Sequence, residues 1–310
     1  MTVNSSEITF FTGAGASKPF GIPTMIKMTE IFGNRLKSQE KELFDNIIKK
    51  LKKIQTQIDI ETVFSLIERF SANEYLRFED PLFYYWKIQN KLPDHVCSTR
   101  QLSNIKVKLQ NNLRNACVLK SSKHSKLFQI YSNFFITITK GLNPAPSIKS
   151  SDIPYDNLWT IFTTNYDICL ETFWRDKYEI DIFTGFFKNG KEFAPDNFFY
   201  SDKGELLNRT TQFQQLRLVK LHESINWLIN RETGKVEEKE YNLKTAKKIG
   251  RGFYDKEVLM YPLIEKELYV DPYIQMFYCL NKELENKRVC LTIGYSFRDP
   301  IIRNFFIKNF

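Results

Sequence analysis

The sequence predicts an α/β fold: a Rossmann-like, doubly wound and mainly parallel sheet with a large helical insertion. Three observations support this prediction. Short apolar runs of strand length recur along the chain, segments with helical spacing alternate with them, and polar or glycine-rich turns follow the runs. This alternation is typical of βαβ units, whose parallel strands are buried on both faces and are therefore continuously apolar.

The first strand and the insertion are expected in the N-terminal half of the chain. Residues 8–11 are β-branched or aromatic and run into a glycine turn at 13–17, so we expect a strand there. Residues 25–140 have apolar positions at helical spacing and are expected to form a helical insertion subdomain. Residues 143–156, rich in Pro, Ser and Asp, are expected to be a connecting loop.

The remaining strands and helices are expected to alternate in the second half. The expected strands are 158–162, 216–221 and 289–293, with 258–261 as a weaker fourth parallel strand. The expected helices are 167–175, 272–285 and 300–308. Ligands of a doubly wound sheet bind at the carboxyl ends of its strands, and the polar turns of this chain lie at those ends.

Length and composition indicate a globular protein. The 310 residues are 42% hydrophobic and 26% charged, which excludes a disordered chain, a collagen-like chain and a disulfide scaffold. No stretch approaches the roughly 18 apolar residues of a membrane span, and no secretory signal is present, so we expect a cytoplasmic protein. We expect one domain, 1–310, with 25–140 as its insertion. The sequence also fits the N-terminal part of a longer protein, because it stops soon after Pro300.

Charge and cysteine content narrow the class of ligand. The formal net charge of +9, from 45 Lys and Arg against 36 Asp and Glu, favours an anionic ligand. The basic residues at 49–53 alternate with apolar residues in helical rhythm, which favours a solvated helix face over a nucleic-acid groove. The five cysteines form no C-x-x-C pair and only three histidines accompany them, so we expect buried thiols and no metal site.

Gly13 and Gly15 form the turn after the first strand. Such a turn lets the backbone approach a ligand closely, and its amides suit a pyrophosphate. Lys18 stands where the dinucleotide-binding fingerprint has its third glycine, and no G-K-[ST] follows. Taken alone, the turn is therefore as consistent with a purely structural role as with phosphate binding.

The later strand ends carry candidate functional side chains, each with a structural alternative. Asn165 is a candidate for ligand contact, whereas Asp167 is also well placed to cap the next helix. His222 ends the third run and suits a general base near neutral pH, with a structural histidine as the alternative. Ser296 is a candidate for holding a ribose or a phosphate, and Asp299 for capping the last helix.

Four motifs follow one another in the order of a known family. They are Gly13-Ala14-Gly15-Ala16-Ser17 with Gly21-Ile22-Pro23, Thr164-Asn165-Tyr166-Asp167, Lys220-Leu221-His222 with Ser224, and Gly294-Tyr295-Ser296-Phe297-Arg298-Asp299. Together they resemble the sirtuin superfamily, specifically the sirtuin-like NAD-hydrolase domains of bacterial anti-phage defence proteins. The resemblance covers residues 8 to about 304, with no motif in the helical insertion.

The resemblance implies a role for each motif. Asn165 and His222 would be the catalytic residues, with His222 as the base. The residues implied to bind NAD are Gly13, Ala14, Gly15, Ser17, Pro23, Asp167, Gly294 and Ser296. The glycine turn would hold the pyrophosphate, Asp167 would face the nicotinamide ribose, and Ser296 would bind the adenosine half. Pro23 would belong to the loop that covers nicotinamide.

Three features of the sequence depart from the deacylating sirtuins. The paired C-x-x-C zinc ligands of those enzymes are absent, so protein deacylation is disfavoured and a zinc-independent enzyme is expected. Residues 24–26 replace the Asp-Phe-Arg segment that follows the G-I-P motif. Glu223 replaces the glycine after the histidine and places a carboxylate beside the proposed base.

We therefore expect an NAD hydrolase that acts as the effector of an anti-phage defence or abortive-infection system by depleting NAD. The expected products are nicotinamide and ADP-ribose or a cyclic form, with ADP-ribosyl transfer as a related reaction. Because such an activity must be restrained, we expect a homo-oligomer or a partner defence protein, a phage protein or nucleic acid as trigger, and no membrane. One alternative is a non-catalytic NAD or ADP-ribose sensor or regulatory subunit; another is a nucleic-acid-associated protein that uses the +9 charge.

Overall fold

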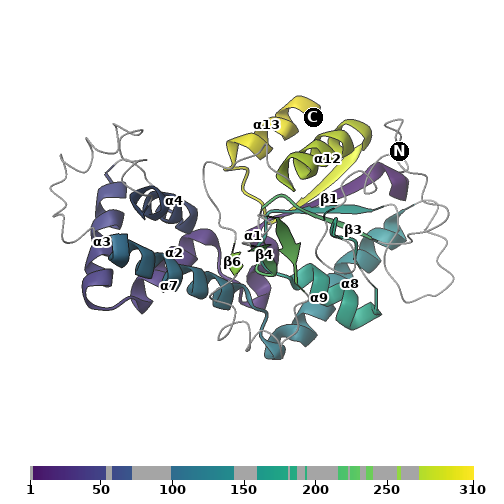
Figure 1. Cartoon of the computed structure of the whole chain (residues 1–310). Coiled ribbons are helices and arrows are strands. Elements are labelled where there is room, and N and C mark those ends of the chain that lie inside the picture. The colour runs from purple at the N-terminus through teal and green to yellow at the C-terminus, as the bar shows by residue number, and fades with distance from the viewer. Residues whose placement is uncertain are drawn as a thin grey trace. The chain divides into compact units, whose positions relative to one another are not determined.

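The described part of the protein consists of two compact units (Figure 1). The computed structural model describes residues 3–53, 58–71, 99–142, 159–180, 182–186, 193, 216–222, 224–230, 235–239, 257–259 and 272–310. The larger unit contains the described residues up to Ile22 and from Cys117 onward, and the smaller unit contains those of Pro23–Ala116.

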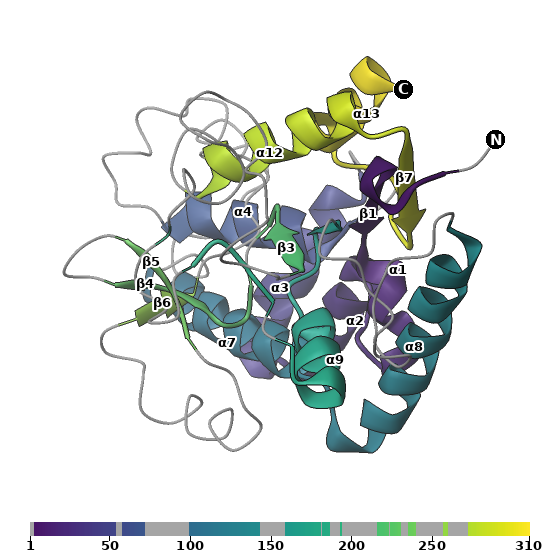
Figure 2. The same ribbon diagram turned by 90° about the vertical axis from the view of Figure 1, so that its right-hand side faces the viewer.

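A four-stranded parallel sheet forms the centre of the larger unit (Figure 2). Its strands are β1 (Ile8–Thr12), β2 (Thr160–Thr163), β3 (Arg217–Lys220) and β7 (Val289–Ile293), in the order β3-β2-β1-β7. Every neighbouring pair is parallel. The direction in which strands are added reverses at β1, which makes the boundary between β1 and β7 the switch point of the sheet. The predicted α/β, mainly parallel, Rossmann-like fold is confirmed.

Helices cover both faces of this sheet, and neighbouring residues of β1 pack against them in opposite directions. The Phe10 ring lies 5.8 Å from the Phe135 ring of α8 (His124–Gly141), whereas the Phe11 ring lies 5.2 Å from the Phe306 ring of α13 (Pro300–Asn309). Figure 1 shows α8 with α9 (Cys169–Tyr178) on one side of the sheet, and α13 with α12 (Tyr273–Asn286) on the other. The packed helices therefore cover the two faces of the sheet. The carboxyl ends of the strands are the part of the sheet where a ligand site is expected.

Short turns connect the first strand to the rest of the larger unit. The 3-10 turn η1 (Ser5–Glu7) precedes β1, and a single helical turn, α1 (Ala14–Ser17), follows it. A second 3-10 turn, η2 (Lys18–Phe20), ends at Gly21, whose φ of 87° favours glycine. A third, η3 (Ser121–Lys123), leads into α8.

A second, antiparallel sheet follows β3 and corrects one prediction. It consists of β4 (Trp227–Asn230), β5 (Val236–Glu238) and β6 (Glu257–Leu259), in the order β5-β4-β6. The expectation that 258–261 forms a fourth parallel strand is wrong, because β6 pairs antiparallel with β4. A run this short carries no periodicity that distinguishes one sheet or one direction from another.

The smaller unit is helical. Its helices are α2 (Met25–Arg35), α3 (Ser38–Leu51), α4 (Ile60–Ser71) and most of α7 (Thr99–Cys117). The apolar positions that predicted helices are buried, as at Leu43 and Ile47 on α3 and at Ile105 and Leu109 on α7. The helical spacing of these segments therefore corresponds to real helices with one buried face.

Some predictions fall partly or wholly outside the described residues. The expected loop at 143–156, Cys97 and Glu223 lie outside them. Of the other cysteines, Cys117, Cys169 and Cys279 are buried free thiols, and Cys290 is partly buried. Within the described ranges, no helix combines the length and the apolar composition needed to cross a membrane.

Candidate functional site

Two glycine turns meet at the switch point between β1 and β7. Gly13 N–H donates to the Ile293 carbonyl and Gly15 N–H to the Gly294 carbonyl, each at 2.9 Å. Gly294 has a φ of 65°, and a Cβ on it would lie 2.2 Å from the Ala16 nitrogen. The packing of one backbone against the other thus requires glycine, and it fixes the turn after β1 against the turn after β7.

Asn165 lies just beyond β2 and contacts the first glycine turn. Its backbone N–H donates to Thr163 Oγ1 at 3.1 Å, and its side-chain Nδ2 donates to Ser17 Oγ at 3.0 Å. The residue is 7% exposed, and its Oδ1 is buried with no hydrogen-bond partner in the described part of the chain. An unsatisfied buried acceptor costs about 1–3 kcal/mol, so this oxygen is suited to receive a donor from a ligand.

Asp167 is buried two residues further on and lies just before the next helix. Its Oδ1 accepts a hydrogen bond from the backbone N–H of Cys169, the first residue of α9, at 3.0 Å. Burial, followed by the charge of Asp167, raises the pKa of the Cys169 thiol well above its ordinary value. The N-cap of α9 is Ile168 and not Asp167, so the expected N-cap position is wrong by one residue. One oxygen of the Asp167 carboxylate nevertheless satisfies the first N–H of the helix from the preceding position.

Lys220, the last residue of β3, is a buried cation behind this loop. The residue is 1% exposed, and its Nζ donates to the Asp167 carbonyl at 2.8 Å and to Ser224 Oγ at 2.6 Å. Glu171 of α9 supplies the countercharge, with Oε1 at 2.7 Å from Nζ. Lys220 thus ties the loop after β2 to the loop after β3, and both loops carry predicted site residues.

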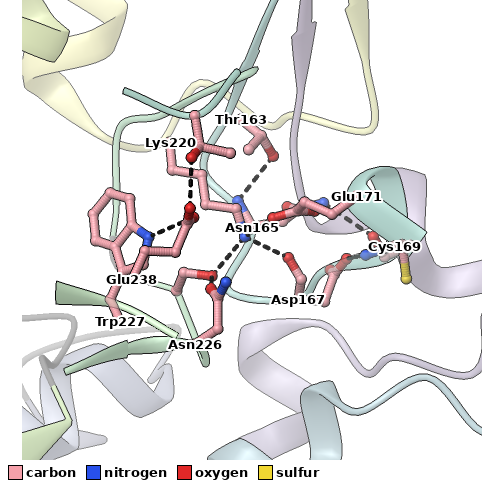
Figure 3. Close-up of polar contacts among 12 residues, drawn as sticks. Thr163, Asn165, Asp167, Cys169, Glu171, Lys220, Asn226, Trp227 and Glu238 are labelled. Carbon is pink, nitrogen blue, oxygen red and sulfur yellow. Dashed lines mark hydrogen bonds and ion pairs between the residues drawn. The ribbon is translucent and has the colours of Figure 1, made fainter. Parts of the chain in front are cut away.

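The contacts continue from this lysine to the antiparallel sheet (Figure 3). Ser224 Oγ donates to Asn226 Oδ1, and Asn226 Nδ2 donates to the Lys239 carbonyl. Glu238 accepts hydrogen bonds from Thr184 Oγ1 at 2.7 Å and from Trp227 Nε1 at 3.4 Å. Hydrogen bonds through Asn226 therefore connect the loop after β3 to the residue that follows β5.

Glu238 is perturbed by this environment. Burial raises the pKa of the Glu238 carboxyl above its usual value, and the negative charge of Glu171 acts in the same direction. The Thr184 hydrogen bond, the charge of Lys220 and the Trp227 hydrogen bond oppose this rise. The antiparallel sheet therefore places a carboxyl with a raised pKa where the charge of Lys220 acts on it.

His222 lies beyond β3 and meets a residue that follows β7, the strand at the opposite edge of the sheet. It is 5% exposed, and its Nε2 lies 3.3 Å from Oδ2 of Asp299. The other oxygen of Asp299, Oδ1, accepts hydrogen bonds from Ile301 N–H at 2.9 Å and Ile302 N–H at 3.3 Å. Asp299 is therefore the N-cap of α13, as predicted, and contacts the candidate base as well.

The other predicted residues differ in their surroundings. Ala14 and Gly15 are half-buried in α1. Ser296 is exposed, and its Oγ accepts from Arg298 Nε at 3.3 Å. Pro23 belongs to the smaller unit, and its role over nicotinamide stays a prediction.

The larger unit thus brings several predicted residues together in pairs. It joins Ser17 to Asn165, the turn of Gly13 to that of Gly294, and His222 to Asp299. Each pair links the ends of two different strands of the parallel sheet. The predicted site residues of the larger unit therefore gather at the carboxyl edge, where a doubly wound sheet binds its ligand.

Tyr131 of α8 is a buried polar group near the site that the sequence reasoning missed. Burial, with the nearby Cys169 and Asp167, raises the pKa of its phenol well above the ordinary value, and a hydrogen bond with Ser17 acts against this. Tyr131 shares the buried helix face of Leu127 and Phe135. The sequence could have indicated Tyr131 as a candidate, because its hydroxyl stands on a helix face whose other buried residues are apolar.

The cluster is built from polar side chains at strand ends, with an imidazole–carboxylate pair and a buried amide acceptor. Among the described residues, no group of three or more His, Cys, Asp or Glu side chains is placed to hold a metal ion. The polar groups that are present suit the binding of a polar organic ligand and proton transfer to or from it.

The comparison with known families agrees with this chemistry. Residues 160–309, from β2 to α13, match the family model described as the SIR2-like domain. The match supports a relationship to the sirtuin-like superfamily, whose SIR2-like domains are typically NAD-dependent enzymes, and it indicates an NAD-related activity. No curated protein matches the chain.

Proposed function

We propose that this protein is a zinc-independent NAD hydrolase that cleaves NAD into nicotinamide and ADP-ribose. The observation that carries the proposal is Asn165, whose buried Oδ1 has no partner among the described residues while its Nδ2 is held by Ser17. This amide lies at the strand ends of the matched SIR2-like domain. His222, the proposed base, follows the neighbouring strand of the same sheet.

The reaction needs few groups from the protein. When nicotinamide leaves ribose C1′ with the electron pair of the C–N bond, an electron-poor centre remains, as in glycoside hydrolysis. An oriented water or ribose hydroxyl and a base for its proton then lower the barrier. Asn165 Oδ1 would accept a hydrogen bond from that hydroxyl or water, and His222 would accept its proton.

The proposed binding residues suit the rest of NAD. The turn of Gly13, Ala14, Gly15 and Ser17 would hold the pyrophosphate. Because the N–H groups of Gly13 and Gly15 donate to the Ile293 and Gly294 carbonyls, the Ala14 amide and the Ser17 hydroxyl would supply its hydrogen bonds. Asp167 would face the nicotinamide ribose with the oxygen that Cys169 does not use. The adenosine half would contact Gly294 and Ser296, and Pro23 would belong to the loop over nicotinamide.

The proposed biological role is that of an effector in anti-phage defence or abortive infection, acting in the cytoplasm by depleting NAD. It is supported by the four motifs that resemble such effector domains. Continuous NAD loss would harm the cell, so we propose that a homo-oligomer or a partner defence protein controls the activity. A phage protein or a nucleic acid would be the trigger.

Chromatographic measurement of nicotinamide and ADP-ribose tests the proposed reaction. The wild type should release both products, and Asn165→Ala and His222→Ala should each lose about 10²-fold or more of the rate. Asn133→Ala, on the exposed face of α8, and His124→Ala, at the start of that helix, are matched controls and should keep the rate. Full turnover by both site variants would contradict the proposal. NAD binding without product would instead favour a sensor.

A further inference from the structure

We propose that Asp299 is a positioning residue that acts through His222, and this inference rests on the proposed hydrolysis. Asp299 Oδ2 lies 3.3 Å from His222 Nε2. An N–H on Nε2 that faces this carboxylate leaves Nδ1 as the proton acceptor of the neutral ring. The aspartate thus selects which nitrogen of His222 serves as the base.

The cap of α13 holds the carboxylate in place for this task. Oδ1 accepts from two backbone N–H groups of the first turn, those of Ile301 and Ile302. The helix dipole favours a negative charge at this end of a ten-residue helix. Capping alone uses Oδ1, whereas Oδ2 is the oxygen that meets the histidine. The capping role expected from the sequence therefore explains only half of this side chain.

The loop before Asp299 holds one residue in an unfavourable backbone conformation that ring packing stabilises. Phe297 has a φ of 54°, which is rare for a bulky residue. Its ring packs between Tyr295 at 5.0 Å and Phe306 of α13 at 4.9 Å, which holds this conformation. At the other end of the loop, Gly294 is packed against the turn after β1. Asp299 is consequently anchored to both the switch point and α13.

The surroundings make the pair electrostatically effective. The His222 and Asp299 side chains are 6% and 17% exposed, so water screens their interaction less than at an open surface. Tyr166, on the loop after β2, is a further titratable neighbour, with its ring centroid 6.2 Å from that of His222. Of the nearby cations, Lys220 is paired with Glu171, and Arg298 contacts the Ser296 hydroxyl. Among the described residues, Asp299 thus supplies a countercharge next to the imidazole.

The proton balance of the proposed step is simple. The O–H bond of a water or ribose hydroxyl breaks, its proton binds His222 Nδ1, and the oxygen uses its electron pair to bond ribose C1′. Nicotinamide leaves with the pair of the C–N bond. Asp299 stays ionised and stabilises the imidazolium that forms, because an opposite charge at this distance favours the protonated ring.

Three substitutions separate the tasks of Asp299. Asp299→Asn keeps the cap and the length but removes the charge, Asp299→Ser keeps a cap but is too short to reach His222, and Asp299→Ala removes both. We expect the Asn and Ser variants to lose about 10-fold to 10²-fold in kcat at unchanged KM and nearly unchanged Tm. The acidic limb of the pH–rate profile of Asp299→Asn should move to lower pH by about one unit.

Comparison of Asp299→Asn with a control variant and with the wild type tests the positioning role. Asp176→Asn, on α9 beside Arg175, is the matched control and should change neither kcat nor the profile. A wild-type rate and profile in Asp299→Asn, when His222→Ala is inactive, would overturn the positioning role and leave the proposed hydrolysis intact. If the wild type does not turn over NAD, an NMR titration of the His222 ring in the wild type and Asp299→Asn decides instead. A midpoint that falls by about one unit supports the pairing, and an unchanged midpoint refutes it.

Discussion

Replacing Lys220 with methionine should destabilise the fold strongly. Methionine has a similar length and fills much of the space, so the substitution removes mainly the charge and its hydrogen bonds. The change would strand the Glu171 carboxylate, which is 14% exposed, and leave the Asp167 carbonyl and Ser224 hydroxyl without the lysine donor. The perturbation therefore tests whether this cation holds the loops after β2 and β3 together.

The expected loss follows from the burial of the pair. Removing one partner of a buried ion pair typically costs about 3–5 kcal/mol. Because Glu171 retains some exposure and can recover part of its hydration, we expect about 3 kcal/mol for Lys220→Met. Adding Glu171→Leu removes the stranded charge, so the double variant should regain about 1–2 kcal/mol.

Equilibrium unfolding in urea measures these differences as changes in the free energy of unfolding. Lys282→Met is the matched control, since Lys282 pairs with Glu285 on the open surface of α12 and its loss should leave the urea midpoint nearly unchanged. A loss below about 1 kcal/mol for Lys220→Met would refute the reasoning, because it would mean that the network contributes no more than a surface pair.

Three further predictions concern the strand ends and the buried titratable groups. Gly294→Ala should lower the free energy of unfolding by more than about 2 kcal/mol, because its Cβ would lie 2.2 Å from the Ala16 nitrogen. Gly21→Ala should lower it by only about 1 kcal/mol, because within the described ranges its Cβ meets a flexible lysine carbon at 4.0 Å and nothing nearer. Thermal unfolding measures both losses, and equal losses would contradict this reasoning. The raised pKa of Glu238 means that the folded state holds the proton more tightly, so stability should fall as pH rises above about 4.5; Glu238→Gln should remove that slope in urea titrations, and an unchanged slope would count against the assignment. Burial raises the pKa of Cys290 to about 12, so iodoacetamide at about pH 8 should label it slowly until the protein unfolds, as peptide mass spectrometry would show; rapid labelling of the native protein would refute this.

The central sheet could be predicted because its strands are short, largely apolar and followed by distinctive turns. β1, β2 and β3 are buried along their whole length, and β7 is partly buried. The run at 289–293 coincides with β7, and the helix expected at 300–308 matches α13, which begins with Pro300 after its Asp299 cap. The position of β6 could not be predicted in the same way. Which sheet a three-residue strand joins depends on its partner β4 and not on its own pattern.

The sequence predicted individual residues of the candidate site, but not the contacts between residues that are far apart in sequence. Asn165 and His222 stand out because each is a polar residue close after an apolar run. The contact between His222 and Asp299 joins residues far apart in sequence, and the capping role of Asp299 already gave it a sufficient local explanation. The partners of Lys220 likewise come from separate loops. Such contacts follow from the packing of the strand ends, which no short motif encodes.

The crystal structure of the His222→Ala protein in complex with NAD would test the central claim most directly, because this variant should bind the substrate without consuming it. We predict that the nicotinamide ribose or its bound water donates a hydrogen bond to Asn165 Oδ1, and that the pyrophosphate contacts the turn at residues 13–17. NAD bound elsewhere on the protein, or bound at the strand ends with Asn165 Oδ1 out of contact, would contradict the account.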